Sequence, residues 1–303
     1  MNILVTGISG YIGSLVAPRL QRDGHAVRGF ARHPQRVNSS VPVIEGDAIS
    51  GAGLQRALDG IDVAYFLIHS MEPGADPFAN RERSAAQRFA DAARAAGVQR
   101  IVYLGGLVPE AGPRSDHLAS RLEVERILLQ SLPSSVALRA SIVIGARSRS
   151  FRFLVRLVER LPVLVVPAWH GNRTQPIDER DMVELLARSA TSDAVAGQTL
   201  DVGGPDLVSY GELIERIRDL MLLDRPALQF KRLTVTPIAS RIAAVIAGEQ
   251  HELIGPLMES LDTDLIPGDD RAAKLLMVKL HSLNAAIERS LREWEATEPL
   301  KAR

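Results

Sequence analysis

The sequence predicts an α/β fold, a Rossmann-type doubly wound parallel sheet with a smaller, mostly helical C-terminal lobe. Three observations lead to this prediction. The apolar run at 2–5 passes directly into a glycine-rich turn, short apolar runs alternate with helix-forming segments as far as residue 144, and residues 231–303 are mostly helix-forming but interrupted by prolines. We expect the sheet domain to span residues 1–205, with some lobe segments inserted after 145, and the helical lobe to span 206–303.

The glycine-rich turn has the sequence TGISGYIG at residues 6–13. Glycines at this spacing permit a tight turn, let the backbone approach a pyrophosphate, and allow the following helix to pack closely on the strand. The helix expected at 14–22 then offers free amides and the positive end of its dipole to an anion. A second strand at 26–31 completes a βαβ unit of about thirty residues, and this context predicts a dinucleotide site.

The alternation of strands and helices continues along the chain. We expect strands at 43–45, 63–68, 100–104 and 136–144, and helices at 54–58, 83–96 and 115–129. In a doubly wound sheet, ligands bind at the carboxyl ends of the strands. The later elements are predicted to be helices at 151–161, 178–190 and 213–222, a strand at 199–202, and helices after residue 231 broken at Pro237, Pro256 and Pro267.

The composition narrows the class of ligand. The 303 residues include no cysteine, which excludes disulfides, thiolate metal sites and a cysteine nucleophile. Equal numbers of basic and acidic residues, 36 of each, leave no overall basic field for nucleic acid, so we expect a small-molecule substrate or effector. The histidines show no convincing metal-ligand spacing and no Gly-x-Ser-x-Gly elbow occurs, so neither a metal nor a serine nucleophile is expected.

The apolar stretches bear on location. The N-terminus enters the first strand at once, which leaves no room for a signal peptide and predicts a cytoplasmic protein. No apolar stretch reaches the roughly eighteen residues of a membrane span. A peripheral membrane contact through 238–246 stays open beside the simpler expectation that this segment faces a core. The sequence does not determine the oligomeric state.

Six segments in order carry a family resemblance, namely TGISGYIG at 6–13, EGDA at 45–48, YFLIHSM at 65–71, RIVYLGGL at 100–107, RTQPIDERDM at 173–182 and VGGPDLVSYGEL at 202–213. Together they resemble the atypical, extended-like branch of the short-chain dehydrogenase/reductase superfamily, which includes NmrA-like proteins and proteins similar to the 39-kDa subunit of complex I. The resemblance implies a nucleotide-binding Rossmann fold that holds NAD(P), in a superfamily dominated by oxidoreductases.

The resemblance also implies which residues contact the coenzyme. The pyrophosphate would be held at the glycine-rich motif by Gly7, Ser9, Gly10, Tyr11, Ile12 and Gly13. Asp47 and Ala48 would contact the adenine, Leu67 and His69 would border the nicotinamide ribose, and Gly105 would lie beside the nicotinamide. An alternative for His69 is a polar residue that merely ends an apolar strand.

The end of the second strand bears on which coenzyme binds. An NAD-preferring protein places a carboxylate there to accept hydrogen bonds from the ribose hydroxyls, whereas this chain has Ala31 and Arg32. Arg32, with Arg36 or His33 nearby, would instead pair with a 2′-phosphate. We therefore predict NADP(H) in preference to NAD(H), the alternative being a solvated surface arginine.

The catalytic residues usual in this superfamily are missing. Most active members use a tyrosine, a lysine one helical turn later, and a serine after the fifth strand. Here the serine position holds Gly105 or Gly106, and HLASR at 117–121 stands where Tyr-x-x-x-Lys is expected. His117 and Arg121 share one helix face, so His117 is a candidate acid/base and Arg121 a candidate ligand of a ribose or substrate oxygen.

Two functions remain open from the sequence. The first is an NADP(H)-dependent oxidoreductase acting on a small, largely apolar carbonyl compound or enone, with the proton supplied by His117 or by water. The second is a non-catalytic NADP(H)-sensing or structural protein, in which His117 and Arg121 are simply solvated. Tyr65 and Tyr103 are the other phenols near the predicted site, but strand alternation is expected to turn them into the core.

Overall fold

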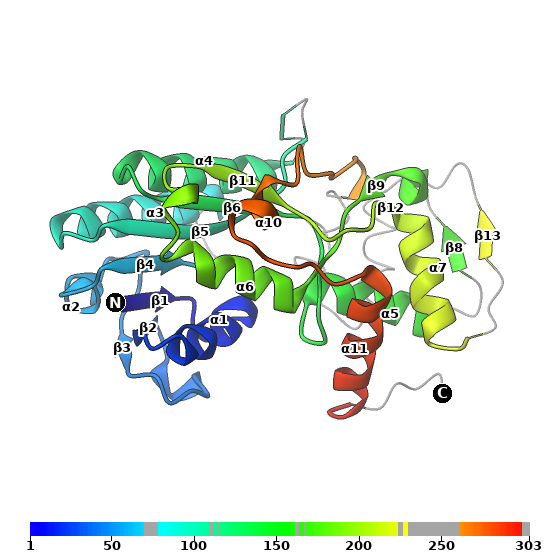
Figure 1. The fold of residues 1–303 in the computed structure, drawn as a ribbon, viewed down its shortest axis with the longest axis horizontal. Coiled ribbons are helices and arrows are strands. Elements are labelled where there is room, and N and C mark those ends of the chain that lie inside the picture. Colours follow the sequence, from blue (N-terminus) through cyan, green and yellow to red (C-terminus); the bar gives the residue numbers. More distant parts are fainter. Residues whose placement is uncertain are drawn as a thin grey trace.

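The computed structural model describes residues 1–69, 78–109, 112–113, 115–160, 164–166, 168–223, 227–229 and 261–298. Its centre is a parallel sheet of seven strands in the order β11-β6-β5-β4-β1-β2-β3 (Figure 1). The strands are β1 (Asn2–Thr6), β2 (Ala26–Ala31), β3 (Val43–Glu45), β4 (Val63–Phe66), β5 (Arg100–Gly106), β6 (Val136–Ala140) and β11 (Thr199–Val202). This order reverses direction between β1 and β4, as in a doubly wound Rossmann sheet, and the predicted fold class is confirmed.

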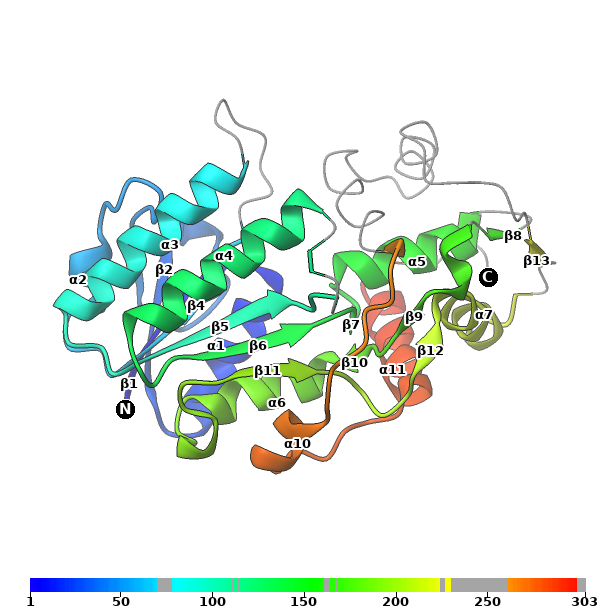
Figure 2. The ribbon, with the colours of Figure 1, turned by 90° about the horizontal axis from the view of Figure 1, so that it is seen from above.

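Helices cover both faces of the sheet (Figure 2). One face carries α1 (Tyr11–Arg22), α6 (Glu179–Ser189) and α10 (Arg271–Leu275), and the other carries α2 (Leu54–Leu58), α3 (Phe78–Ala95) and α4 (Asp116–Ser131). Side chains alternate along each strand, so Ile3 and Val5 pack with the α1 and α6 layer while Leu4 packs with the α2 and α3 layer. Both faces are therefore buried, which is why the strands are almost entirely apolar.

A second hydrophobic core lies beyond the carboxyl ends of the strands, and we call the part that surrounds it the lobe. It is built mainly by α5 (Arg149–Arg160), the short helix η2 (Ala168–Gly171), α7 (Tyr210–Leu220) and α11 (Leu283–Glu295). Its largest buried side chains include Phe151, Trp169, Tyr210 and Trp294. The lobe thus draws on segments before residue 205 as well as after it, and the helices expected at 231–260 lie outside the described residues.

The remaining elements are short. They are η1 (Pro34–Arg36), β7 (Val143–Ile144) paired with β10 (Ile177–Asp178), β8 (Leu164–Val166) paired with β13 (Ala227–Gln229), β9 (Arg173–Thr174) paired with β12 (Val208–Ser209), and η3 (Asp193–Val195). The strand predicted at 136–144 is therefore two strands. The Ala140 carbonyl still accepts from the Leu107 amide of the main sheet, whereas the Ile142 carbonyl accepts from the Ile177 amide at 2.9 Å, so the chain changes partners there.

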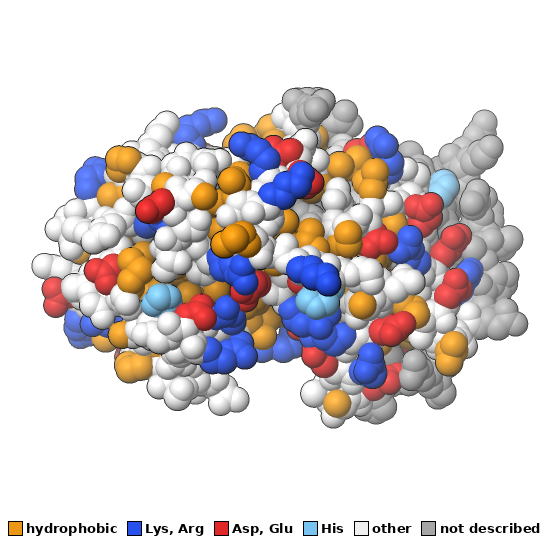
Figure 3. Space-filling model, in the orientation of Figure 1, with side chains coloured by type: hydrophobic (Ala, Val, Ile, Leu, Met, Phe, Trp, Pro, Cys, Tyr) orange, Lys and Arg blue, Asp and Glu red, His pale blue; other side chains and the backbone are white. Residues whose placement is uncertain are grey.

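The surface agrees with the balanced charge of the sequence. Acidic and basic side chains are interspersed across the face drawn in Figure 3, as expected of a chain with 36 residues of each sign. Among the helices in the described ranges, none combines the length and apolar character needed to cross a membrane.

Candidate functional site

The glycine-rich turn joins β1 to α1 in the shape that the sequence predicts. The Gly10 amide donates to the Gly7 carbonyl at 2.8 Å, and Gly7 has a positive φ of 65°. A Cβ atom at Gly7 would lie 2.5 Å from the Leu67 carbonyl oxygen, and one at Gly13 would collide with the Gly7 carbonyl oxygen. Both positions therefore require glycine, because the turn packs against the end of β4 and the helix packs against the turn.

The start of α1 is suited to an anion. Its N-cap residue is Gly10, which provides no side-chain cap, and its first turn contains no acidic residue. The first amides of the helix therefore have no side-chain acceptor competing for them, and the helix dipole favours negative charge at this end. These are the features that hold a pyrophosphate at the first turn of a dinucleotide-binding fold.

A cavity of about 670 Å³ runs from this turn along the carboxyl ends of the strands to the lobe. It brings together the predicted residues Gly7, Ser9, Gly10, Tyr11, Ile12, Gly13, Arg32, Asp47, Ala48, Leu67, His69, His117 and Arg121. Gly105 does not line it, and Gly106 does. A Cβ atom built at Gly105 would lie 3.1 Å from the Tyr103 ring, because alternation along β5 turns this position toward the core. The place of Gly105 beside the nicotinamide stays a prediction.

One end of the cavity has the character of an adenosine site. Arg32 is exposed at the end of β2, and Ala48 is buried after β3. The carboxylate of Asp47 accepts from the Ile49 amide at 2.9 Å, which fixes the turn that it belongs to. Asp47 is the only carboxylate residue among the described residues that line the cavity.

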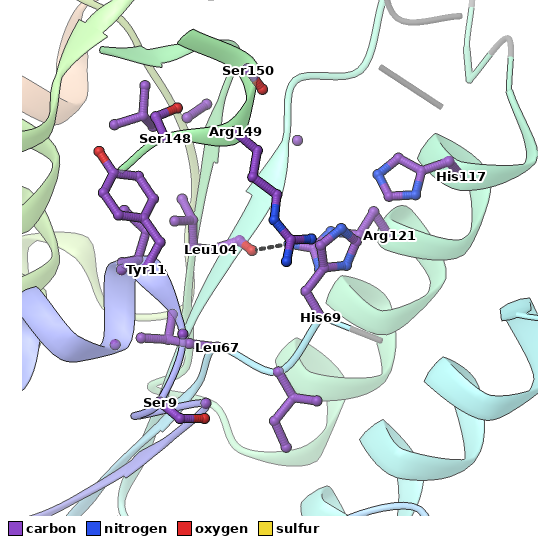
Figure 4. A pocket seen from close by; sticks show the side chains of 18 of the residues that line it. Ser9, Tyr11, Leu67, His69, Leu104, His117, Arg121, Ser148, Arg149 and Ser150 are labelled. Atoms are coloured by element: carbon purple, nitrogen blue, oxygen red, sulfur yellow. Dashed lines mark hydrogen bonds between the residues drawn. The ribbon is translucent and has the colours of Figure 1, made fainter. Parts of the chain in front are cut away.

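His69, His117 and Arg121 line the other end of the cavity (Figure 4). Together with Glu82 and Ser120, which are hydrogen-bonded to each other, they form a polar cluster that we call the Glu82 cluster. Glu82 is 4% exposed and accepts from Ser120 Oγ at 2.8 Å, and its Oε1 lies 3.1 Å from His69 Nδ1. Arg121 donates to the Leu104 carbonyl and places Nη1 3.3 Å from His69 Nδ1. The rings of His69 and His117 lie 5.1 Å apart. Glu82 was not predicted, because it lies in the charged stretch RERS at residues 81–84, which is typical of a solvated helix face.

Comparison with known proteins agrees with this geometry. Residues 7–140 match the sequence profile of a family described as NAD(P)H-binding. The chain is 28% identical over 250 residues, 80% of each protein, to a (4-alkanoyl-5-oxo-2,5-dihydrofuran-3-yl)methyl phosphate reductase of Streptomyces griseus subsp. griseus. This chain resembles the atypical short-chain dehydrogenase/reductase superfamily and contains an NAD(P)H-binding region. It is also 30% identical over 231 residues to an uncharacterized protein of Mycobacterium tuberculosis, but those residues cover only 24% of that longer protein.

Solved structures share the fold of this chain. A superfamily member from Agrobacterium tumefaciens with bound NAD has a TM-score of 0.72 at 18% identity, covering 98% of this chain and 97% of the other. The triphenylmethane reductase of Citrobacter sp., complexed with NADP(H), has a TM-score of 0.74 at 18% identity, covering 96% of this chain and 100% of the other. Both coenzymes thus occur on this fold.

The ionisation of the Glu82 cluster is unlike that of the usual catalytic set of this superfamily. Burial, followed by the charges of His69 and Arg121, lowers the pKa of His117 to about 3. Burial and Arg121 also lower the pKa of His69, although the hydrogen bond to Glu82 opposes them. Burial would raise the pKa of Glu82, but the His69 hydrogen bond and Arg121 together hold it below its ordinary value. At neutral pH the cluster therefore contains an ionised carboxylate, a guanidinium and two neutral imidazoles.

The tyrosines near the site do not replace the missing catalytic one. Tyr65 is buried and donates to the Leu186 carbonyl at 2.8 Å, and Tyr103 is buried and donates to the Arg121 carbonyl at 3.2 Å. Burial raises the pKa of both phenols. They hold the core and the helix that carries Arg121, as strand alternation predicts.

Tyr11 has a different task at the edge of the cavity. Its hydroxyl donates to Glu179 Oε2 at 2.6 Å, and Glu179 Oε1 accepts from Arg289 of α11 at 2.9 Å. A Cβ atom at Gly145 would collide with both the Tyr11 hydroxyl and the Glu179 carboxylate, so a glycine there leaves room for the contact. The network fastens the first turn of α1 to the lobe.

Proposed function

We propose that this protein is an NADP(H)-dependent oxidoreductase that reduces a small carbonyl compound or enone. The observation that carries the proposal is the single cavity that joins the glycine-rich turn to the Glu82 cluster and the lobe. The coenzyme would lie along it with the 2′-phosphate at Arg32 and the pyrophosphate at the start of α1. The substrate would lie between the Glu82 cluster and the apolar side chains of Leu107, Ile142 and Leu265, which favour a largely apolar body.

The preference for NADP(H) is argued from charge. Arg32 lines the cavity at the end of β2, and a guanidinium binds a phosphate through paired, charge-assisted hydrogen bonds. Because Arg32 is exposed, we expect Arg32→Ala to weaken NADPH binding by about tenfold and to leave NADH binding unchanged. Fluorescence titration of both coenzymes tests this, with Arg22→Ala, an exposed arginine at the end of α1, as a control for lost charge. Equal affinities of the unmodified protein for the two coenzymes would refute the preference.

The reaction needs a hydride, which NADPH supplies when bound, and a proton. His117 is neutral at pH 7 because of its low pKa, so it can hydrogen-bond to a substrate oxygen but holds no imidazolium proton to give. Arg121 remains charged and would stabilise negative charge that develops on the substrate oxygen. Water would then protonate the product. The Streptomyces relative is named as a reductase of an (alkanoyl-oxo-dihydrofuranyl)methyl phosphate, a conjugated carbonyl compound, which supports including enones among the substrates tested.

The test of catalysis is NADPH oxidation against a panel of aldehydes, ketones and enones. We expect Arg121→Ala to reduce kcat/KM by about 100-fold or more, and His117→Ala to reduce it by about tenfold or less. Thermal denaturation and the NADPH affinity of each variant show whether it remains folded. Turnover that survives both substitutions unchanged would refute these roles without refuting the reductase.

A non-catalytic NADP(H)-binding protein is the second candidate. It is favoured by the glycines at 105 and 106 in place of the usual serine, by the absence of tyrosine and lysine from 105–121, and by the neutral state of His117. Tight NADPH binding without turnover on any member of the panel would support it over the reductase.

A further inference from the structure

The charges that line the cavity are unbalanced at its lobe end. The described lining residues include four arginines, Arg32, Arg121, Arg147 and Arg149, and one carboxylate residue, Asp47, at the adenosine end. Three of the four arginines are accounted for by the contacts above or by the proposed coenzyme. Arg32 faces the proposed 2′-phosphate, Arg121 lies 3.9 Å from the Glu82 carboxylate, and Arg147 donates to Ser14 of α1 at 3.2 Å, beside the glycine-rich turn.

Arg149 is different. It is the first residue of α5 and is exposed, and its side chain extends into the cavity toward His69 and Arg121 (Figure 4). Among the described residues it forms no hydrogen bond and no ion pair. Its positive charge nevertheless acts on His69, because it helps to lower the pKa of that imidazole.

Two further features of the cavity lining bear on the role of Arg149. The consecutive residues 147–150 all line the cavity, so the N-terminus of the twelve-residue helix α5, with Ser148 and Ser150, borders it. Tyr210 is buried and also lines the cavity; its hydroxyl faces the Thr174 hydroxyl, and neither of the two has a well-formed hydrogen bond. A buried hydroxyl without a well-formed hydrogen bond is costly, and a bound ligand oxygen would satisfy it.

We propose that the start of α5, with Arg149 as its charged residue, binds an anionic group, a carboxylate or a phosphate, on the substrate. Arg149 is then a specificity-determining residue, and the substrate class becomes a small carbonyl compound with an apolar body and one anionic end. The inference rests on the proposed function, because it takes the rest of the cavity to be filled by NADP(H). The helix dipole of α5 adds to the attraction, and two neutral imidazoles beside Arg149 do not oppose it.

The test measures binding of simple probes to protein saturated with NADP⁺. Benzoate and phenyl phosphate supply the two anionic groups, and benzamide is a neutral compound of similar shape. We expect at least one anion to bind about 10- to 100-fold more tightly than benzamide, as expected for a hydrogen-bonded charge pair. Whichever anion binds more tightly identifies the group.

The variants decide whether Arg149 is responsible. Arg149→Gln should remove the preference for the anion, and Arg149→Lys should retain part of it. Arg126→Gln, which removes an exposed arginine of α4 outside the cavity, should leave it unchanged. The inference is overturned if neither anion binds more tightly than benzamide, or if Arg149→Gln retains the preference.

A separate titration with NADPH keeps this inference distinct from the proposed function. If Arg149→Gln weakens NADPH as much as it weakens the anion, Arg149 is a coenzyme ligand and the inference fails. If the unmodified protein binds no coenzyme, the proposed function fails first. Coenzyme binding without any anion preference refutes only the role of Arg149.

Discussion

Replacement of Glu82 by glutamine tests the Glu82 cluster through stability. The carboxylate is 4% exposed, accepts from Ser120 at 2.8 Å, contacts His69 at 3.1 Å, and lies 3.9 Å from the Arg121 guanidinium. A glutamine side chain of similar size keeps one carbonyl oxygen, which can accept from only one of the two donors, Ser120 or His69. Its amide group would then face the other donor. It also leaves the Arg121 charge without its compensating partner.

The expected cost follows from these contacts. A hydrogen bond to a charged group contributes about 1.5 to 3 kcal/mol, and a donor left unsatisfied in a buried site costs about 1 to 3 kcal/mol. Because the second donor can rotate toward remaining acceptors, we expect Glu82→Gln to lower the free energy of unfolding by about 2 to 4 kcal/mol at pH 7. Denaturant unfolding of the coenzyme-free protein measures this directly.

The pH dependence supplies a second, independent check. The pKa of Glu82 lies below its ordinary value of 4.5 in the folded state, so its contribution is present above pH 4.5 and is lost as the pH falls through the folded-state pKa. The difference between the two proteins should therefore narrow below pH 4.5. Glu123→Gln is the matched control, since Glu123 pairs at 2.6 Å with an exposed arginine and should change stability little. A loss at Glu82 no larger than that of the control would refute the reasoning.

Three further predictions concern neighbouring parts of the site. The NMR signals of the His117 ring should not titrate between pH 5 and 8, because the pKa of His117 is about 3, and a titration midpoint near 6.5 would contradict its burial. The stability that the neutral imidazole contributes should decline as the pH falls below 6.5. Tyr11→Phe should destabilise the protein by about 1 to 2 kcal/mol in denaturant unfolding, because the buried Glu179 carboxylate loses its 2.6 Å donor; an unchanged midpoint would show that Arg289 alone suffices. Gly13→Ala should weaken NADPH binding at least about tenfold in a fluorescence titration, because the new methyl group displaces the turn, whereas Gly171→Ala, where the methyl group meets open space, should bind normally. Equal affinities of the two alanine variants would contradict the role of the turn.

Much of the fold was predictable because its signals are local. The turn between β1 and α1 depends on glycines at fixed spacing, and the parallel sheet follows from apolar runs that alternate with helices. The lobe was harder to predict because its core joins distant segments. Trp169 and Trp294 share that core, although one precedes and the other follows the boundary expected at residue 205.

The sequence predicts His69, His117 and Arg121 as site residues, but for physical reasons it could not predict Glu82, Arg149 or the register of Gly105 and Gly106. In the pair Gly105 and Gly106, a shift of one residue exchanges the cavity side for the core side, and neighbouring glycines give no pattern to fix the register. Glu82 is buried only because Ser120 and His69, which lie far from it in the sequence, supply donors. Arg149 points into the cavity because α5 starts there, which depends on the change of strand partners after Ala140.

The central claim is that the start of α1 and the cavity beside it bind a nicotinamide coenzyme. Isothermal titration of the purified protein with NADPH and with NADH tests it most directly. We predict saturable binding at one site per chain, tighter for NADPH. Failure of both coenzymes to give a saturable signal would contradict the claim and, with it, both proposed functions.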